Sequence, residues 1–363
     1  MKRKIFNSQR PATEAAAQRP FLSPSALRGE GRANSRNLPL NIMEVCGTHT
    51  NAIAKSGLKT LLAGRINFIS GPGCPVCVSA QSDIDNMLAL ALKPGVITAT
   101  FGDMLRVPGA KMSLKDAQTA GADVRIIYSP LQAVDIAQKN PNKKIIFLAV
   151  GFETTAPAAA AAVLAARKLK LKNFYVYTAL KRVAPAVELI LKEKNNIDGF
   201  LLPGNVSVIT GLKEFDFISE KYAKPAAAAG FSAKEILAAL AKLGKPKTQN
   251  AYAWVKAGGN KTALRLTAKV FTPAAGSWRG FGKIEQSALE LKEEFAAFDA
   301  KKVFKIRAQK ERKTKCRCAL ILKGKIPPQK CPYFARVCTP QKPLGPCMVS
   351  QEGACAAAYN NMG

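Results

Sequence analysis

The stretches MEVCGTHT, residues 43–50, and GPGCPVC, residues 71–77, each follow a short apolar run that is typical of a β-strand. They contain the only histidine of the chain, His49, and three of its nine cysteines: Cys46, Cys74 and Cys77. Thiolates and imidazole are soft or borderline metal ligands, and thiols also carry out redox chemistry. Open α/β sheets form their ligand crevices at the carboxyl ends of strands, so a chemical site is predicted at this place.

Short apolar runs alternate with stretches of helical spacing, which predicts an α/β fold with parallel sheets. Strands are expected at 40–45, 66–70, 96–101, 124–128, 144–150, 174–178 and 200–202. Helices are expected at 53–62, 84–92, 158–166, 183–191 and 236–243. A further strand is expected at 266–271, and a charged helix at about 284–297. The same alternation of strands and helices occurs twice, which indicates two similar α/β lobes, residues 39–140 and 141–265, with a pocket between them.

The two ends of the chain differ from its middle. Residues 1–38 are basic and nearly free of acidic residues, which predicts a disordered extension. Residues 266–363 form a return segment that ends in a cysteine-rich part, in which six cysteines and six prolines lie between Cys316 and Cys355. Such a segment needs a cofactor or cross-links to become ordered.

Composition narrows the class of protein. The 363 residues suit two or three domains, and the formal net charge is +31. The lysines are spread along the chain without a nucleic-acid-binding signature, which favours a soluble basic surface over binding to DNA or RNA. No run of about 18 apolar residues predicts a membrane helix. Nine clustered cysteines, an odd number, favour a reducing cytoplasm and metal or redox use over a secreted disulfide scaffold.

The C-terminal cysteines have spacings that suit an iron–sulfur cluster. Only Cys316 and Cys318 are close, and one intervening residue is too few for a zinc knuckle. The pattern C-x12-C-x6-C-x16-C favours a [4Fe–4S] cluster, with zinc or disulfides as the alternatives; its members are Cys318, Cys331, Cys338 and Cys355. The two cysteines left over, Cys316 and Cys347, are then a redox-active disulfide near the cluster or buried thiols.

The remaining candidates lie after strands. Cys74 and Cys77 form a C-x-x-C, which indicates a reversible dithiol or, alternatively, two structural thiols. Cys46 and His49 can bind a metal together, or the imidazole can lower the pKa of the thiol. Asp103 follows the third expected strand and either joins this site or caps a helix.

One further motif combines a carboxylate with hydroxyls. Glu153, Thr154 and Thr155 follow the strand expected at 144–150. At the start of a helix they suit a small anion such as cyanide or phosphate, and they also suit a capping arrangement for that helix.

Six motifs in order resemble the HypD family of hydrogenase formation proteins, which help build the iron centre of [NiFe] hydrogenases. They are CGTH at 46–49, GPGCPVC at 71–77, FGDMLRVP at 101–108, GFETT at 151–155, WRG at 278–280, and the terminal CP…GPCMVS…EGAC that ends at Cys355. The resemblance covers about residues 41–359.

The resemblance implies a fold of two α/β lobes with a third part that bears a [4Fe–4S] cluster. It implies that Cys46 is the main ligand of an iron that carries cyanide and carbon monoxide, with His49 beside it and Glu352 supporting the site. Cys74 and Cys77 are then a redox dithiol near the iron. By the same resemblance, the four cysteines of the spacing pattern bind the cluster. Cys316 and Cys347 then relay electrons between the cluster and the dithiol.

The resemblance also implies partners. A small HypC-like protein would share the Fe(II), a HypE-like protein would donate cyanide, and the hydrogenase large subunit would receive the iron. This chain has Asn51 and Asn205 where relatives often have histidine, which leaves His49 alone. Two other functions compete with an assembly scaffold that transfers electrons: a ferredoxin-linked disulfide reductase and a zinc-containing nucleic-acid-binding protein. If the relay exists, the fold brings Cys74 and Cys77 near Cys316 and Cys347.

Overall fold

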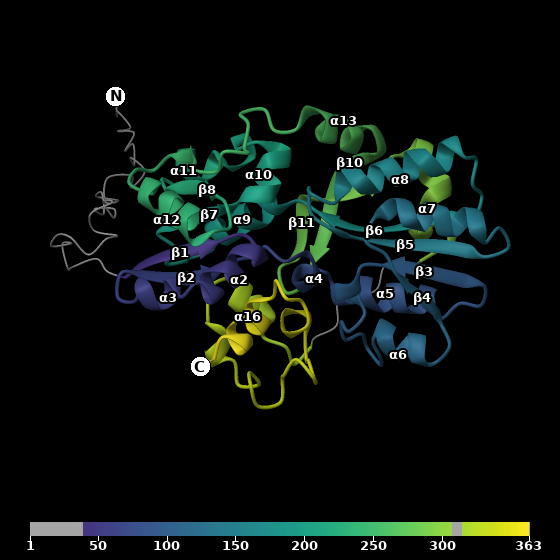
Figure 1. Cartoon of the computed structure of the whole chain (residues 1–363), viewed down its shortest axis with the longest axis horizontal. Helices are drawn as coiled ribbons and strands as arrows, with labels where there is room; N and C mark the ends of the chain where they lie inside the picture. Colours follow the sequence, from purple (N-terminus) through teal and green to yellow (C-terminus); the bar gives the residue numbers. More distant parts are fainter. Residues whose placement is uncertain (1–38, 307–313, 363) are drawn as a thin grey trace, which may run out of the picture.

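The structure is a computed structural model that describes residues 39–306 and 314–362, and its strands form two sheets at the centres of two lobes (Figure 1). The first sheet is parallel throughout, in the order β2-β1-β7-β8-β9. Its strands are β1 (Leu40–Glu44), β2 (Ile66–Ser70), β7 (Gly199–Pro203), β8 (Ala226–Ala229) and β9 (Thr248–Asn250). Its connecting helices are α2 (Gly47–Lys55), α3 (Leu58–Leu61), α10 (Gly204–Thr210), η3 (Lys213–Phe215), α11 (Phe217–Glu220) and α12 (Ala233–Lys242).

The second sheet has the order β10-β11-β6-β5-β3-β4. Its strands are β3 (Val96–Thr100), β4 (Asp123–Ile126), β5 (Lys144–Gly151), β6 (Phe174–Lys181), β10 (Phe271–Trp278) and β11 (Gly282–Leu291). The first four are parallel, and β10 and β11 add an antiparallel hairpin beside β6. The helices of this lobe are α5 (Gln81–Ala91), α6 (Leu114–Thr119), α7 (Pro130–Lys139), α8 (Ala156–Lys168), α13 (Lys261–Val270), η4 (Glu293–Phe298) and α14 (Ala300–Val303). The connecting helix α9 (Val183–Lys192) leads from β6 to β7 and contacts both β11 and α11.

Burial on both faces explains the apolar character of the central strands. All residues of β5 after Lys144 are buried. The alanines of α8 pack on one face of this strand because their small side chains allow a close approach, and residues of α4 (Pro75–Val78) and α5 pack on the other face. A parallel strand covered on both faces reads as a continuous apolar run, which is the pattern that the sequence shows at 144–150.

The chain passes between the lobes more often than expected. After β2 it enters the second lobe and builds β3 to β6 there, and it then returns to build β7, β8 and β9 beside β1. The two sheets therefore combine strands from both expected ranges, and the division at residues 140 and 141 does not separate them. Periodicity identifies a strand but not its neighbours, because any parallel neighbour is reached through a crossover.

Two expected elements were wrong. The strand expected at 266–271 is instead the end of α13, whose N-cap Asn260 accepts a hydrogen bond from the backbone of Ala263 at 3.0 Å. The charged helix expected at 284–297 is instead β11 followed by η4. β11 pairs with strands on both sides, so this pairing overrides the helical propensity of Lys283, Glu285 and Glu290.

The cysteine-rich end lies below the first lobe, where it is drawn in yellow (Figure 1). Its short elements are α15 (Cys318–Leu322), η5 (Pro328–Lys330), η6 (Pro346–Met348) and α16 (Ala354–Asn360). α16 packs against α2, and η6 packs against α4. The extension expected at residues 1–38 lies outside the described residues. Within 39–306 and 314–362, no helix is long and apolar enough to cross a membrane.

Candidate functional site

A cavity of about 230 Å³ lies where the two lobes and the cysteine-rich end meet. Cys46 belongs to the first lobe, Thr154 and Thr155 to the second, and Glu352 to the C-terminal segment. The principal lining residues are Cys46, Thr48, Gly73, Pro75, Phe152, Thr154, Thr155, Asn205 and Glu352. Thr154 and Asn205 are exposed, so the cavity is open to solvent at that rim. We call it the Cys46 cavity.

Cys46 is held by close backbone approaches. It is the N-cap of α2, directly after β1, so its side chain lies at the carboxyl end of the sheet. The Gly47 N–H donates to the Gly73 carbonyl at 3.0 Å. A Cβ on Gly73 would collide with the backbone of Cys46, and a Cβ on Gly47 would collide with Glu352. Glycine is therefore required at both positions, and the CGTH and GPGCPVC motifs fix each other.

The Cys46 thiol is protonated at neutral pH. Burial raises its pKa to about 11, and the nearby Glu352 carboxylate adds to the rise. A thiolate at this position requires a compensating cation, because removing the proton leaves a buried negative charge beside another. A divalent metal ion supplies that charge, and thiolate is a suitable ligand for iron. The residue thus fits the metal role expected for it.

His49 does not line the Cys46 cavity. Its Nε2 lies 2.9 Å from the Gly230 carbonyl and 3.2 Å from the Ala229 carbonyl, so Nε2 carries the hydrogen. Burial lowers its pKa to about 4, which keeps the ring neutral at physiological pH. The buried Nδ1 has no hydrogen-bond partner among the described residues. The His49 imidazole therefore connects α2 to the end of β8, whereas the His49 backbone N–H faces the Cys46 thiol.

Asp103 and Glu352 are joined through the C-terminal segment. Asp103 lies in η2 (Gly102–Met104), and its carboxylate accepts a hydrogen bond from Ser350 Oγ at 3.0 Å. Ser350 Oγ in turn accepts from the Glu352 N–H at 3.2 Å, and Glu352 accepts from Thr48 Oγ1 at 2.7 Å. Burial raises the pKa of Glu352, and the charge of Asp103 raises it further. Asp103 thus reaches the cavity indirectly, by positioning the turn that carries Glu352.

The GFETT motif splits between two places. Thr154 and Thr155 line the Cys46 cavity, whereas Glu153 turns away and accepts a hydrogen bond from the Val183 N–H at 2.9 Å, at the start of α9. Burial raises the pKa of Glu153 to about 7, with a further contribution from the Glu214 charge. The hydroxyls are available to a small ligand in the cavity, and the carboxylate serves as a cap.

One carboxylate near the site was missed from the sequence. Glu44 is buried at the end of β1, and it accepts hydrogen bonds from Thr50 Oγ1 and from the Cys46 N–H. Burial raises its pKa to about 8. An acidic residue in an otherwise apolar strand run was the available signal, because a buried carboxyl requires specific partners.

Cys74 and Cys77 form a disulfide in the structure, and both are buried. Cys74 is the N-cap of α4, and its sulfur accepts a hydrogen bond from the Cys77 N–H at 3.2 Å. Pro75 begins this helix and lines the Cys46 cavity. The disulfide is thus next to the cavity. The packing of α4 on η6 also places the segment with Cys77 beside the segment with Cys347.

Five of the six C-terminal cysteines, including the four expected to hold a cluster, surround one small cavity. The cavity, of about 10 Å³, is lined by Cys316, Cys318, Cys331, Cys338 and Cys355. Cys347 is not in this set, and its thiol hydrogen-bonds to that of Cys318. Cys318 hydrogen-bonds to Cys316 as well as to Cys347, and both cysteines of the close pair line the small cavity. The expected division into four cluster cysteines and a Cys316–Cys347 pair stays a prediction.

The thiols around the small cavity suit a cationic group. Burial raises the pKa of Cys355, and the neighbouring thiols raise it further. Within the described ranges, no three His, Cys, Asp or Glu side chains converge as ligands of a single ion. The thiolates of an iron–sulfur cluster each bind a different iron, so they stand farther apart. Five thiols around one apolar space, three of them buried and two partly buried, fit that donor set.

Arg279 of the WRG motif lies between the two thiol regions. Its Nε donates to the Ser79 carbonyl at 2.9 Å, and its Nη1 donates to Gln81 Oε1 at 2.7 Å. The hydrogen bond to Cys318 and burial raise the pKa of Cys316, and the Arg279 charge opposes this rise. The WRG motif alone predicts no role for this arginine. The structure places its buried charge between α4 and the C-terminal cysteines.

Comparison with known proteins shows the family of this chain. The family model HypD, described as "Hydrogenase formation hypA family", matches residues 27–362. The hydrogenase maturation factor HypD of Escherichia coli (strain K12) is 42% identical over 331 residues, which cover 88% of this chain and 89% of that protein. HypD of Rhodobacter capsulatus is 40% identical over 335 residues, again 88% and 89%. HypD of Cupriavidus necator is 39% identical and covers 92% of both chains. The chain therefore belongs to the HypD family of hydrogenase maturation factors.

Proposed function

We propose that this protein is a scaffold on which the iron centre of a [NiFe] hydrogenase is assembled, with Cys46 as the ligand that this chain gives to the iron. The Cys46 cavity carries the proposal, because it presents one buried thiol beside hydroxyl and amide groups in about 230 Å³ that open to solvent. One protein ligand leaves positions on the iron for cyanide, for carbon monoxide and for a ligand from a second protein.

The polar groups of the cavity suit these small ligands. The Thr154 and Thr155 hydroxyls and the Asn205 amide can donate hydrogen bonds to the nitrogen of an iron-bound cyanide. Asn205 does not titrate, so it can orient such a ligand but cannot exchange a proton with it. We propose a HypC-like protein as the source of the second thiolate and a HypE-like protein as the cyanide donor. The open rim at Thr154 and Asn205 is the accessible side for both.

We further propose an electron relay from the C-terminal segment. Cys316, Cys331, Cys338 and Cys355 would hold a [4Fe–4S] cluster, which supplies one electron at a time when bound. The Cys318–Cys347 pair would pass two electrons to the Cys74–Cys77 disulfide by thiol–disulfide exchange. The Cys74–Cys77 bond is then reduced to two thiols, two protons are taken up there, and Cys318 and Cys347 become a disulfide. The packing of α4 on η6 supports this order.

The test is anaerobic co-purification with the HypC-like partner, followed by infrared and Mössbauer spectroscopy. We expect cyanide and carbonyl stretches and a low-spin Fe(II) signal in addition to that of the cluster. Cys46→Ala should remove the stretches and leave the cluster signal. Thr60→Ala, at an exposed position of α3, is the matched control and should change neither. Stretches that persist in Cys46→Ala would refute the assignment of Cys46.

A disulfide reductase is the second candidate, favoured by the Cys74–Cys77 disulfide beside η6. Such an enzyme needs the cluster and the dithiol but no iron at Cys46. Iron in the purified complex beyond that of one cluster, lost in Cys46→Ala, argues against this alternative.

A further inference from the structure

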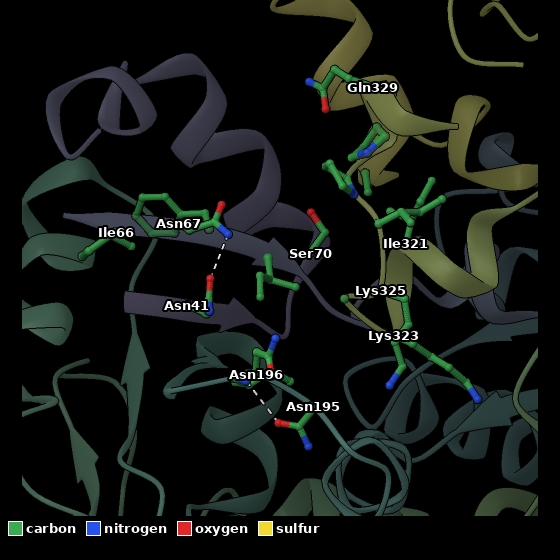
Figure 2. Close-up of a pocket in the computed structure, with 18 of the residues that line it drawn as sticks. Asn41, Ile66, Asn67, Ser70, Asn195, Asn196, Ile321, Lys323, Lys325 and Gln329 are labelled. Carbon is green, nitrogen blue, oxygen red and sulfur yellow. Dashed lines mark hydrogen bonds between the residues drawn. The ribbon is translucent and has the colours of Figure 1, made fainter. Parts of the chain in front are cut away.

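A second cavity, of about 680 Å³, runs along β2 and extends past Asn41 of β1 to the loop before β7. Its walls are β2, the loop at 194–197 that precedes β7, and residues 321–329 of the C-terminal segment (Figure 2). All five residues of β2 line it. Successive side chains of a strand point to opposite faces, so the cavity wraps around the edge of the sheet. We call it the β2-edge groove.

The edge that faces this groove has backbone groups without a strand to pair with. β2 is the terminal strand of its sheet and pairs only with β1 among the described residues. The Leu40 N–H donates to the Arg65 carbonyl, and the Gly71 N–H donates to the Glu44 carbonyl. Alternation in a parallel ladder then turns the backbone of Asn67 and Ile69 towards β1 as well. The amides and carbonyls of Phe68 and Ser70 point into the groove.

The groove is positively charged. Among the residues that the structure describes, no acidic one lines it, whereas four lysines do. These are Lys59, Lys194, Lys323 and Lys325. Figure 2 shows Lys323 and Lys325 extending from the C-terminal segment towards the side of Asn195 and Asn196. Glu193, just outside the lining, pairs with Lys323 at 2.6 Å and with Lys325 at 3.7 Å, so one carboxylate is shared by two of the four ammonium groups.

We propose that the β2-edge groove binds an acidic, extended segment of a partner protein, which adds a strand beside β2. The amides and carbonyls of Phe68 and Ser70 would form the new ladder, and the lysines would select acidic side chains. Residues 1–38 of this chain are poor occupants, because they contain eight basic and only two acidic residues. An unpaired edge in a large groove is a known template for strand addition.

This inference goes beyond the proposed iron chemistry and rests on different residues. β2 leads directly into residues 71–74, which precede the dithiol helix, so a partner bound here is also anchored close to the Cys46 cavity. A failure of strand addition would leave the assignment of Cys46 untouched, and a failure of iron binding would leave the groove untouched.

The experiment measures the binding of fluorescein-labelled (Glu-Val)4 peptide to the full chain by anisotropy. Phe68→Pro removes an N–H that points into the groove without removing a bond to β1, so we expect binding to weaken about tenfold or more. Phe68→Ala is the matched control for loss of the ring and should bind far better than the proline variant. Lys194→Glu should weaken binding about tenfold, and Lys256→Glu, an exposed lysine outside the groove, should not.

A second measurement avoids dependence on the folding of Phe68→Pro. Hydrogen exchange on the unaltered chain should show slower exchange of the Phe68 and Ser70 amides when (Glu-Val)4 is bound. The proposal is overturned if these amides keep their exchange rates in the bound state. It is also overturned if (Glu-Pro)4, which lacks the proline N–H groups, binds equally well, or if an oligonucleotide binds more tightly than (Glu-Val)4 and displaces it in a Lys194-dependent manner.

Discussion

The Cys46 cavity and the small cavity of the C-terminal cysteines both present buried thiols, yet they differ in almost every other respect. The first holds one free thiol in about 230 Å³, among hydroxyl and amide groups and open at its rim. The second holds five thiols around about 10 Å³ with nearly no polar surface. A lone ligand in an open polar space suits a metal that arrives and leaves. Crowded ligands around a small apolar space suit a group that stays.

The largest predicted effect tests which cysteine of the close pair binds the cluster. Cys316→Ser should abolish the cluster, because it removes one of four ligands, whereas Cys318→Ser should retain it. Anaerobic determination of iron and acid-labile sulfide measures both variants. Cluster loss in Cys318→Ser with retention in Cys316→Ser would restore the division expected from spacing alone.

Gly73 tests how closely the two motifs of the first cavity must approach. Gly73→Ala should destabilise the protein by about 3 kcal/mol, since the new Cβ collides with the Cys46 backbone. Gly258→Ala is the matched control, because a Cβ there meets only Lys261 Cε at 4.0 Å. Urea unfolding curves give both free energies. Equal free energies of unfolding for the two variants would mean that the loop carrying Gly73 shifts freely. The close approach of Gly73 to Cys46 would then not be fixed.

The pH dependence of stability tests whether the Glu153 carboxyl lies outside the Cys46 cavity. The folded pKa of this carboxyl, about 7, lies above the unfolded value of 4.5, so the folded state binds the extra proton and stability falls as pH rises through 7. Between pH 5 and 7 this group should contribute a loss of about 2 kcal/mol. Glu153→Gln should flatten that part of the unfolding profile while leaving the infrared bands of bound iron in place. Loss of those bands would instead place Glu153 within the cavity.

Thr48 should give the smallest effect. Thr48→Ala removes the 2.7 Å hydrogen bond to Glu352 and should cost about 1 kcal/mol. Thr48→Ser keeps the hydroxyl and should behave like the unaltered protein in the same urea titration. If alanine and serine are equivalent, the tie between α2 and the C-terminal segment contributes nothing measurable.

Sequence patterns predicted most strands and the residues of the first cavity, but not their neighbours in space. The apolar run at 144–150 and the motif at 46–49 were identified because burial and ligand type are local properties. The pairing of β1 with β7 was not predicted, since it depends on a return of the chain from the other lobe. Glu153 was grouped with Thr154 because they are adjacent, although the turn after β5 sends them in opposite directions.

The choice between Cys316 and Cys318 was equally inaccessible. One residue separates them, and only packing decides which faces the other cysteines. A Cβ on Gly345 would collide with the Cys316 sulfur, so Cys316 is held against the chain that leads to Cys347, and the Cys318 thiol hydrogen-bonds to both Cys316 and Cys347. Spacing statistics contain no information about such a contact.

The pairing of β1 with β7 also has a consequence for biosynthesis. The ribosome produces Cys46 and both cysteines of the dithiol about 120 residues or more before β7 emerges, so β1 cannot pair with β7 until β3 to β6 of the second lobe have been made. During that interval three thiols on the nascent chain remain accessible to oxidants and to stray metal ions. Productive synthesis should therefore depend on a reducing, metal-buffered environment until translation has passed residue 203.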